Sequence, residues 1–321
     1  MTAVFLFLFW LVAAFVLFTT LAPLTDSVQW WIRGWDFPRI HIAIVAAVTI
    51  LIGFGVMRPS VAITCVLLLG CLVYQLYRIY PYTSLATQEI ALAENVPAED
   101  QVKLLSSNVL MENDDPTRLQ ALIEREEPDV LFLMETDQKW IDWLEPQLAR
   151  YDTVIRHPLD NYYGAVFATN LETVTAQTVF LSEDETPSVL AELKAPTGSF
   201  YFVGLHPRPP VPGQNTDERD AQIRRAAIMA DRSILPVVAM GDFNDVAWSR
   251  TSEKFKEYGE FLDPRIGRGM LPSFDAQSWW MRFPIDQLYV TQGLDLITYD
   301  RLEDVGSDHF PMIAVISVKA D

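Results

Sequence analysis

Side chains that bind metal ions or transfer protons recur directly after apolar runs in the second part of the chain. Glu135 follows the run Val130–Met134, and His206 follows Phe200–Leu205. Such runs predict buried strands, and sheet proteins gather their sites where strands end. Each residue alone also fits an ordinary structural role, such as a solvated loop acid or a helix cap. The prediction of a site rests on the ordered set, which is Asn108, Glu135, His206, Asp242, Asn244, Asp286, Asp308 and His309.

These residues occur in short motifs, namely Ser107-Asn108-Val109, Met134-Glu135-Thr136, Gly204-Leu205-His206, Gly241-Asp242-Phe243-Asn244, Ile285-Asp286 and Gly306-Ser307-Asp308-His309. Their order and spacing resemble the endonuclease/exonuclease/phosphatase superfamily over residues 102–318. That superfamily includes apurinic-site endonucleases, pancreatic-type deoxyribonucleases, neutral sphingomyelinases and inositol-polyphosphate phosphatases. The resemblance implies an α+β fold, a four-layer α/β/β/α sandwich of two packed sheets flanked by helices. It also implies hydrolysis of phosphoester bonds with a divalent cation.

The resemblance implies a metal site. The expected cofactor is Mg²⁺, with Mn²⁺ as a substitute, and Mg²⁺ prefers oxygen ligands and keeps several waters. Glu135 would be the principal ligand, with Asn108 and Asp308 close to the same ion. A bound cation would stabilise the charge that develops as a phosphodiester is cleaved.

The remaining residues would move protons and orient the substrate. Asp286 would fix the tautomer of His309, which would act as general acid and base. Asp242 and Asn244 would orient the attacking water and the phosphate. His206 would donate to a non-bridging phosphate oxygen or protect the leaving group. A histidine at this place resembles the deoxyribonuclease, sphingomyelinase and inositol-phosphatase branches.

Three features of the sequence bear on the substrate. Apurinic-site endonucleases place an acid two residues after the first-strand asparagine, and this chain has Leu110 there, which makes abasic-site repair less favoured. Arg208 fits a phosphate contact or a plain loop position equally well. Trp279 and Trp280 either wall the substrate cleft or pack in the core.

The first 80 residues differ in kind from the rest. Three apolar stretches, Ala3–Leu24, Ile40–Met57 and Val61–Tyr77, approach the length of transmembrane helices. No basic segment precedes the first stretch, so a removable signal peptide is the weaker interpretation. The chain therefore divides into a membrane anchor with three transmembrane helices (1–80), a tether (81–101) and a catalytic domain (102–321).

Within the catalytic domain, apolar runs and turn residues predict interleaved helices and strands. The expected strands are Val102–Val109, Val130–Met134, Thr153–Arg156, Ala165–Thr169, Val189–Leu193, Phe200–Leu205, Pro236–Met240, Ile285–Thr291 and Met312–Val318. The first expected helix has Asp115 as its N-cap and Pro116 as its first residue. A second helix carries Trp140 to Leu148, and a third spans Asp217–Ile234.

The distribution of charge excludes some partners. Residues 1–80 contain four basic and two acidic side chains, which leaves 20 basic and 40 acidic residues in 81–321 and a net charge of −20 there. That field disfavours diffuse binding of nucleic acid or anionic lipid. Both cysteines, Cys65 and Cys71, fall in the apolar part, where we expect small buried hydrophobic residues.

The sequence thus favours a membrane-anchored, metal-dependent phosphodiesterase with nuclease-like chemistry. A phospholipid or sphingomyelin-type phosphodiesterase remains open, because the anchor raises the effective concentration of lipid near the site. A catalytically silent binding module is the other alternative.

The expected partners are a phosphoester substrate, either a nucleic acid or a phospholipid head group, and the lipid bilayer through residues 1–80, with no obligate protein partner. The expected location is a multi-pass position in the cell membrane. Arginine counts lean towards a cytoplasmic domain and the acidic tether towards an extracytoplasmic one, with a slight overall lean to the latter.

Overall fold

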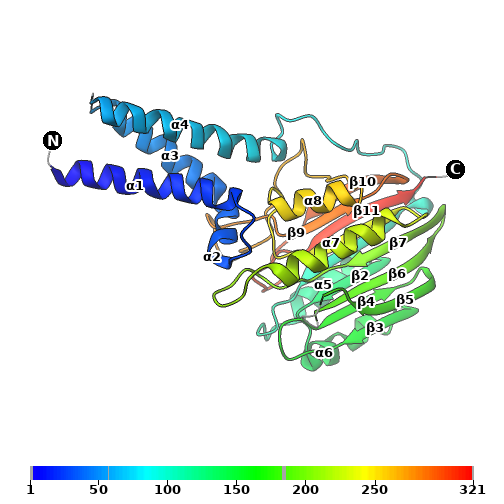
Figure 1. The fold of residues 1–321 in the computed structure, drawn as a ribbon. Coiled ribbons are helices and arrows are strands. Elements are labelled where there is room, and N and C mark those ends of the chain that lie inside the picture. The colour runs from blue at the N-terminus through cyan, green and yellow to red at the C-terminus, as the bar shows by residue number, and fades with distance from the viewer. Residues whose placement is uncertain (1–2, 57, 183–185, 320–321) are drawn as a thin grey trace.

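The computed structural model describes residues 3–56, 58–182 and 186–319. Met57, at the end of the expected second apolar stretch, and residues 320–321 of the expected catalytic domain lie outside this part. The described chain forms an α+β sandwich from which three long apolar helices extend, with the N-terminus at their far end (Figure 1).

Eleven strands form two mixed sheets, which confirms the expected pair of sheets. The first sheet has the order β10-β11-β1-β2-β4-β3 and the second β5-β6-β7-β8-β9. The strands of the first sheet are β1 Val102–Asn108, β2 Val130–Met134, β3 Thr153–His157, β4 Ala165–Thr169, β10 Leu294–Arg301 and β11 Met312–Val318. Those of the second are β5 Glu172–Phe180, β6 Pro187–Ala195, β7 Gly198–Gly204, β8 Val237–Asp242 and β9 Asp286–Val290.

Alternation along β2 shows how the layers are built. Val130, Phe132 and Met134 enter the core between the two sheets, and Leu131 and Leu133 enter the core beneath the helices. Both faces of the strand are therefore buried, which explains why its sequence is apolar without a break.

Helices cover the outer faces of both sheets. The apolar residues of α5 (Thr117–Glu126) and α6 (Gln138–Leu148) pack on the first sheet, and those of α7 (Asp217–Asp231) and α8 (Arg250–Tyr258) on the second. The layers thus run helix, sheet, sheet, helix. Helix α7 ends three residues before the sequence predicted, and α5 begins at Thr117 because Asp115 accepts a hydrogen bond from the Thr117 amide before the first turn.

The N-terminal helices are α1 (Ala3–Leu21), α3 (Arg39–Phe54) and α4 (Pro59–Ile79). Three short helices connect α1 to α3 on the domain side, namely η1 Ala22–Leu24, α2 Trp30–Arg33 and η2 Gly34–Asp36. Two spans, Ala3–Leu24 and Pro59–Tyr82, are long and apolar enough to cross a membrane. The third candidate qualifies only if α3 is counted with Trp30–Asp36, which is bent from it by 76°. Cys65 and Cys71 are free and buried among these helices, as expected.

The helical part is packed directly against the sandwich. The Trp248 indole N–H donates to the Asp36 carbonyl at 2.7 Å, and the Tyr82 hydroxyl donates to the Ala247 carbonyl at 2.7 Å. The segment that follows α4, which includes the turns η3 Tyr80–Tyr82 and η4 Ala98–Asp100, also contacts the sandwich, since Glu89 pairs with Lys256 and the Ala93 amide donates to the Leu296 carbonyl. The apolar helices and the sandwich therefore share one continuous interface.

Candidate active site

The sheet topology brings the eight predicted residues to one end of the sandwich. Strand β1 runs parallel to β2 in one sheet, and β7 runs parallel to β8 in the other, so their carboxyl ends point the same way. Asp242, the last residue of β8, is the register partner of Asp286, the first residue of the antiparallel β9. The Asp242 amide also donates to the Met134 sulfur at 3.1 Å, which joins the two sheets at this end.

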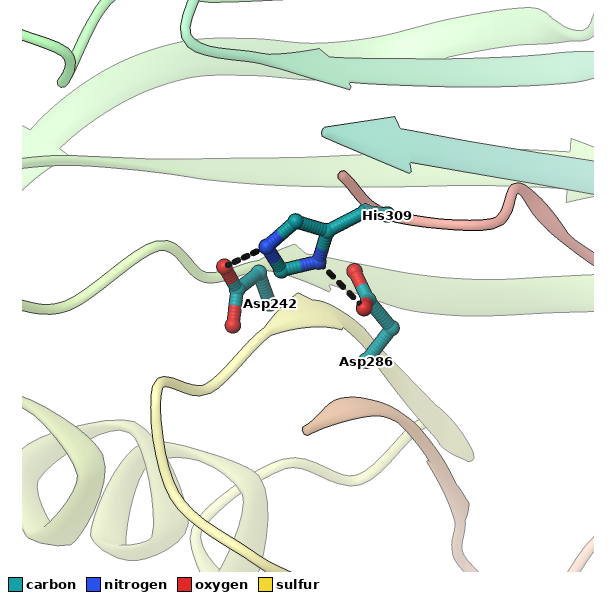
Figure 2. Close-up of side chains that lie close together, drawn as sticks. All are labelled: Asp242, Asp286 and His309. Carbon is teal, nitrogen blue, oxygen red and sulfur yellow. Dashed lines mark hydrogen bonds and ion pairs between the residues drawn. The ribbon is translucent and has the colours of Figure 1, made fainter. Parts of the chain in front are cut away.

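His309 lies between two carboxylates (Figure 2). Its Nδ1 is 2.7 Å from Asp286 Oδ2, and its Nε2 is 3.6 Å from Asp242 Oδ2. Burial by itself disfavours the charged imidazole, but the carboxylates of Asp286 and Asp242 outweigh it and raise the pKa of His309 to about 10. The imidazole is therefore cationic at neutral pH, with Nε2 directed at the position of Asp242.

The turn after β8 depends on a glycine. Gly241 has φ of 140°, and a Cβ there would lie 2.1 Å from the Leu205 carbonyl oxygen, so no larger residue fits. Beyond it, Asp242 Oδ1 accepts a hydrogen bond from the Asn244 amide at 2.8 Å, and the Asn244 side chain donates to the Pro207 carbonyl at 2.9 Å. Burial raises the pKa of Asp242 to about 7.

Glu135 and Asn108 form the opposite side of the site. The Asn108 amide nitrogen donates to Glu135 Oε1 at 2.8 Å and to Asp242 Oδ2 at 3.2 Å. Its carbonyl oxygen accepts from the Leu110 amide at 3.1 Å. Asn108 therefore bridges two carboxylates in this structure. Glu135 itself has φ of 62°, a costly conformation for a residue with a side chain, and such residues concentrate at functional sites.

His206 is buried against the same carboxylates. Its Nε2 lies 3.9 Å from Glu135 Oε1 and 3.8 Å from Asp242 Oδ2. Burial, together with the charge of His309, lowers the pKa of His206 to about 3, so it is neutral at physiological pH. A neutral imidazole offers a hydrogen bond without releasing a proton, which favours contact with a phosphate oxygen over protonation of the leaving group.

Asp308 is half-buried at the rim of the site. Burial raises the pKa of Asp308 and that of Glu135, and the cationic His309 partly offsets this for both carboxylates. The charge of Asp308 raises the pKa of Glu135 further. The Ser307 hydroxyl donates to the Asn108 carbonyl at 2.8 Å and accepts from the His309 amide at 3.0 Å. This serine therefore fixes the loop before β11 on the end of β1.

The donor set fits a hard divalent cation. Glu135, Asp242 and Asp308 contribute three carboxylates to one buried site, whose cationic side chain is His309, and oxygen ligands are those that Mg²⁺ prefers. Asp242, Asp286 and His309 also offer ligand atoms within 4.8 Å of one another. His309 Nδ1 already contacts Asp286 at 2.7 Å, so this trio could transfer protons while the carboxylates of Glu135 and Asp308 could hold the cation.

Three supporting residues escaped sequence reasoning. Ser273 accepts a hydrogen bond from the Asp286 amide at 3.0 Å, and the Phe274 ring lies 4.9 Å from the His309 ring. The Tyr163 ring lies 5.5 Å from the His206 ring. Their contacts cross between loops far apart in the chain, and no local pattern marks them. Ser307 had a signal, because it belongs to the Gly306–His309 motif.

Comparisons with known proteins agree with this geometry. The profile of the Endonuclease/Exonuclease/phosphatase family matches residues 105–309. The solved structure of TDP2 from D. rerio, complexed with single strand DNA product, is similar with a TM-score of 0.57 at 14% identity, over 68% of this chain and 99% of that chain. A family protein from Bacteroides thetaiotaomicron gives 0.54 at 17% identity, over 69% and 99% of the two chains.

A third structure, from Bacteroides vulgatus, gives a TM-score of 0.53 at 20% identity, over 68% of this chain and 99% of that chain. Identities at this level establish the fold alone. No curated protein matches the chain. Because the family profile covers well over half of the sequence and ends on His309, this chain belongs to the endonuclease/exonuclease/phosphatase family and is a phosphoric ester hydrolase of the nuclease and phosphatase type.

Proposed function

We propose that the chain is a membrane-anchored, Mg²⁺-dependent phosphodiesterase. Residues 1–80 form its anchor, 81–101 its tether and 102–321 its catalytic domain. The observation that carries the proposal is the convergence of a buried Asp–His pair with three further carboxylates at one end of the two sheets. This set contains a proton donor, a proton acceptor and oxygen ligands for a cation.

Glu135 would hold the cation, with Asp308 and Asn108 close to it, and Mn²⁺ would substitute for Mg²⁺. Such an ion polarises a phosphoryl oxygen and offsets charge on the leaving group. Asn108 donates both its amide hydrogens to carboxylates, so its contribution is to hold Glu135 and Asp242 in place.

The protein's own groups carry the proton transfers. Asp242, whose pKa burial raises to about 7, accepts a proton from the attacking water, and Asn244 orients that water and the phosphate. His309, held cationic by Asp286, donates its Nε2 proton to the departing alkoxide. Neutral His206 donates a hydrogen bond to a non-bridging phosphate oxygen. A neutral histidine and a charged one thus take separate roles in a single site.

Two substrate classes are compatible with this chemistry, nucleic acid and phospholipid head groups. The similarity to TDP2, whose solved structure holds single strand DNA product, favours the first. The apolar helices favour the second and would place the enzyme in the cell membrane as a multi-pass protein. A catalytically silent binding module would not need this many titratable groups buried at one place.

The full-length chain in lipid nanodiscs tests the proposal with bis(p-nitrophenyl) phosphate and supercoiled plasmid. We expect turnover with Mg²⁺, loss on chelation, and a fall in kcat of about a hundredfold or more for His309→Ala. His157→Ala, which changes a histidine on β3 outside the site, should retain wild-type turnover. Absence of hydrolysis of both substrates, or full activity of His309→Ala, would contradict the proposal.

A further inference from the structure

The segment Asp275–Met281, here named the tryptophan loop, exposes two large aromatic side chains. Trp279 is 87% exposed and Trp280 is 56% exposed, whereas Trp248 and Trp140 are buried. Two adjacent tryptophans that are this exposed indicate a surface that contacts another protein or a membrane. The structure thus favours neither core packing nor a closed cleft wall for this pair.

The tryptophan loop contacts the membrane-proximal end of α3. His41, the third residue of α3, has its Nε2 2.9 Å from the Trp280 carbonyl, and the two rings lie 5.7 Å apart. The ring of Phe283, just beyond the loop, lies 5.6 Å from that of Phe37. Farther along α3, Ile44 and Leu51 are 57% and 70% exposed, as expected for a surface that faces lipid.

This contact determines the depth at which the tryptophan loop would lie relative to a bilayer that α3 crosses. Helix α3 becomes continuously apolar directly after His41, so the boundary between water and hydrocarbon falls at its first turn. Tryptophan is enriched at that boundary because its ring is apolar and its N–H is polar. Trp279 and Trp280 therefore lie where the interfacial layer of a membrane would be.

The same loop is attached to the active site. Phe274, which packs on His309, exchanges backbone hydrogen bonds with Phe283, and the Ala276 amide donates to the Asp308 carbonyl at 2.7 Å. Trp279 is the third residue after Ala276, a span of at most ~11 Å. The polar layer of each leaflet is about 5–8 Å thick. The site is therefore within reach of phosphates in that layer.

Two arginines lie beside the tryptophan loop, although the loop itself holds Asp275 and the domain as a whole is acidic. The guanidinium carbons of Arg282 and Arg301 lie 5.0 and 4.3 Å from the ring centre of Phe310, the residue after His309. Within the described ranges 3–56, 58–182 and 186–319, neither guanidinium forms an ion pair with a carboxylate. Two such cations suit a single phosphate group, while the net charge of −20 over 81–321 opposes a long polyanion.

We infer that the tryptophan loop enters the interfacial layer of the bilayer and that the substrate is the phosphodiester of a membrane phospholipid head group. This inference rests on the proposed function. In the reaction, the oxygen of water bonds to phosphorus and one phosphorus–ester oxygen bond breaks, with the departing alcohol taking a proton from His309. The products are diacylglycerol with a phosphorylated head group, or phosphatidate with the free head-group alcohol.

A fluorescent label tests the contact with the bilayer. In full-length chain with Cys65→Ala and Cys71→Ala, bimane is attached at Trp279→Cys, or at Ile234→Cys as a control. Ile234 is 99% exposed and follows α7, at the opposite end of β8 from the site. In phosphatidylcholine nanodiscs, we expect brominated lipids to quench the label at 279 and leave that at 234 unchanged. Equal quenching at both positions would overturn the inference.

Turnover tests the substrate class. Full-length enzyme is placed in vesicles of phosphatidylcholine, phosphatidylethanolamine and phosphatidylglycerol, and diacylglycerol and phosphatidate are measured by mass spectrometry beside hydrolysis of bis(p-nitrophenyl) phosphate. We expect consumption of phospholipid, and we expect Trp279→Ala/Trp280→Ala to lower the ratio of lipid to soluble turnover about tenfold. Ile234→Ala should leave that ratio at its wild-type value.

The outcomes separate the inference from the proposed function. Hydrolysis of the soluble diester without consumption of lipid, or an equal loss on both substrates in the double variant, overturns the inference and leaves the phosphodiesterase assignment standing. Failure to hydrolyse either substrate contradicts the proposed function, and the label at position 279 still decides whether the loop meets the bilayer.

Discussion

At the scale of single residues, the two site histidines illustrate how environment separates identical side chains. His309 lies 2.7 Å from one Asp286 oxygen and 3.6 Å from one Asp242 oxygen, whereas the buried His206 lies 3.8 and 3.9 Å from Asp242 and Glu135 and makes no short contact with either. Electrostatic attraction dominates in the first case and desolvation in the second. One histidine is consequently a cation and the other neutral at the same pH.

Nuclear magnetic resonance of histidine-labelled, metal-free chain checks this assignment. The pKa of His309 is raised to about 10 and that of His206 is lowered to about 3, so neither ring should titrate between pH 5 and 9. His309 should remain protonated and His206 neutral throughout. Asp286→Asn removes the closest carboxylate and should bring the titration of His309 down towards about 6.5. A wild-type His309 that titrates near neutrality would contradict the geometry.

A second prediction concerns Glu135 and the binding of the metal ion. Glu135→Gln retains the side-chain volume but removes the anionic ligand, so the Mg²⁺ concentration that gives half-maximal activity should rise by about tenfold to a hundredfold. Glu112→Gln is the matched control, because Glu112 is nearby but exposed and hydrogen-bonded to Tyr162. Titration of activity with Mg²⁺ measures both. The same half-saturation in the two variants would remove Glu135 from the metal site.

The sequence predicted the candidate site residues but not their mutual arrangement. The structure brings all eight to one end of the sandwich, yet their roles stay predictions until tested. Asn108 shows the difference, because the sequence identifies the residue but not that its amide nitrogen faces Glu135 and Asp242 and its oxygen accepts from the Leu110 amide. Orientation of an amide depends on neighbours that close around it in three dimensions, and a linear pattern does not contain them.

At the scale of elements, the turn after β8 determines where Asp242 and Asn244 point. Gly241→Ala should destabilise the fold and lower kcat, because the added Cβ would lie 2.1 Å from the Leu205 oxygen and separate β8 from β7. Gly269→Ala is a matched control, since Gly269 has a similar φ of 145° with nothing within 4 Å of the added atom. Both substitutions carry backbone strain of about 1–3 kcal/mol.

Comparison of the two glycine variants isolates the steric effect. Thermal unfolding and steady-state kinetics should show a larger loss for Gly241→Ala in both stability and activity. If Gly269→Ala is equally damaging, backbone strain alone accounts for the result and close approach to β7 is unimportant.

Most strands were predictable from the sequence, and those that were missed lack a regular apolar pattern. Strand β5 is an edge strand without a buried residue, so no hydrophobic face marks it. In β10 a register shift between Leu296 and Thr298 interrupts the alternation of buried residues. Helix α8 buries only Ser252 and Phe255, too few for a clear helical period. Tertiary pairing stabilises these elements where the local signal is weak.

At the scale of the whole molecule, packing between the helical part and the sandwich connects the apolar helices to the domain that carries the site. Trp248, Phe283 and Ile285 form one apolar cluster with Tyr82, and Phe37 packs against it. The sequence predicted the separate parts but not this contact. An apolar residue is expected to be buried, but its type does not tell which part of the chain packs against it. A docked domain has a fixed orientation towards the bilayer, whereas a freely tethered one would not.

A paired substitution tests the docking. Trp248→Ala and Trp140→Ala each remove a fully buried indole and should cost about 3–5 kcal/mol of unfolding free energy. Of these two indoles, Trp248 contacts the helical part, through the Asp36 carbonyl, whereas Trp140 belongs to α6 and packs on the first sheet. Hydrogen exchange of residues 28–37 should therefore increase in Trp248→Ala and stay protected in Trp140→Ala. Equal exchange in both variants would mean that the interface does not depend on Trp248, and the site would then be free to move relative to the membrane.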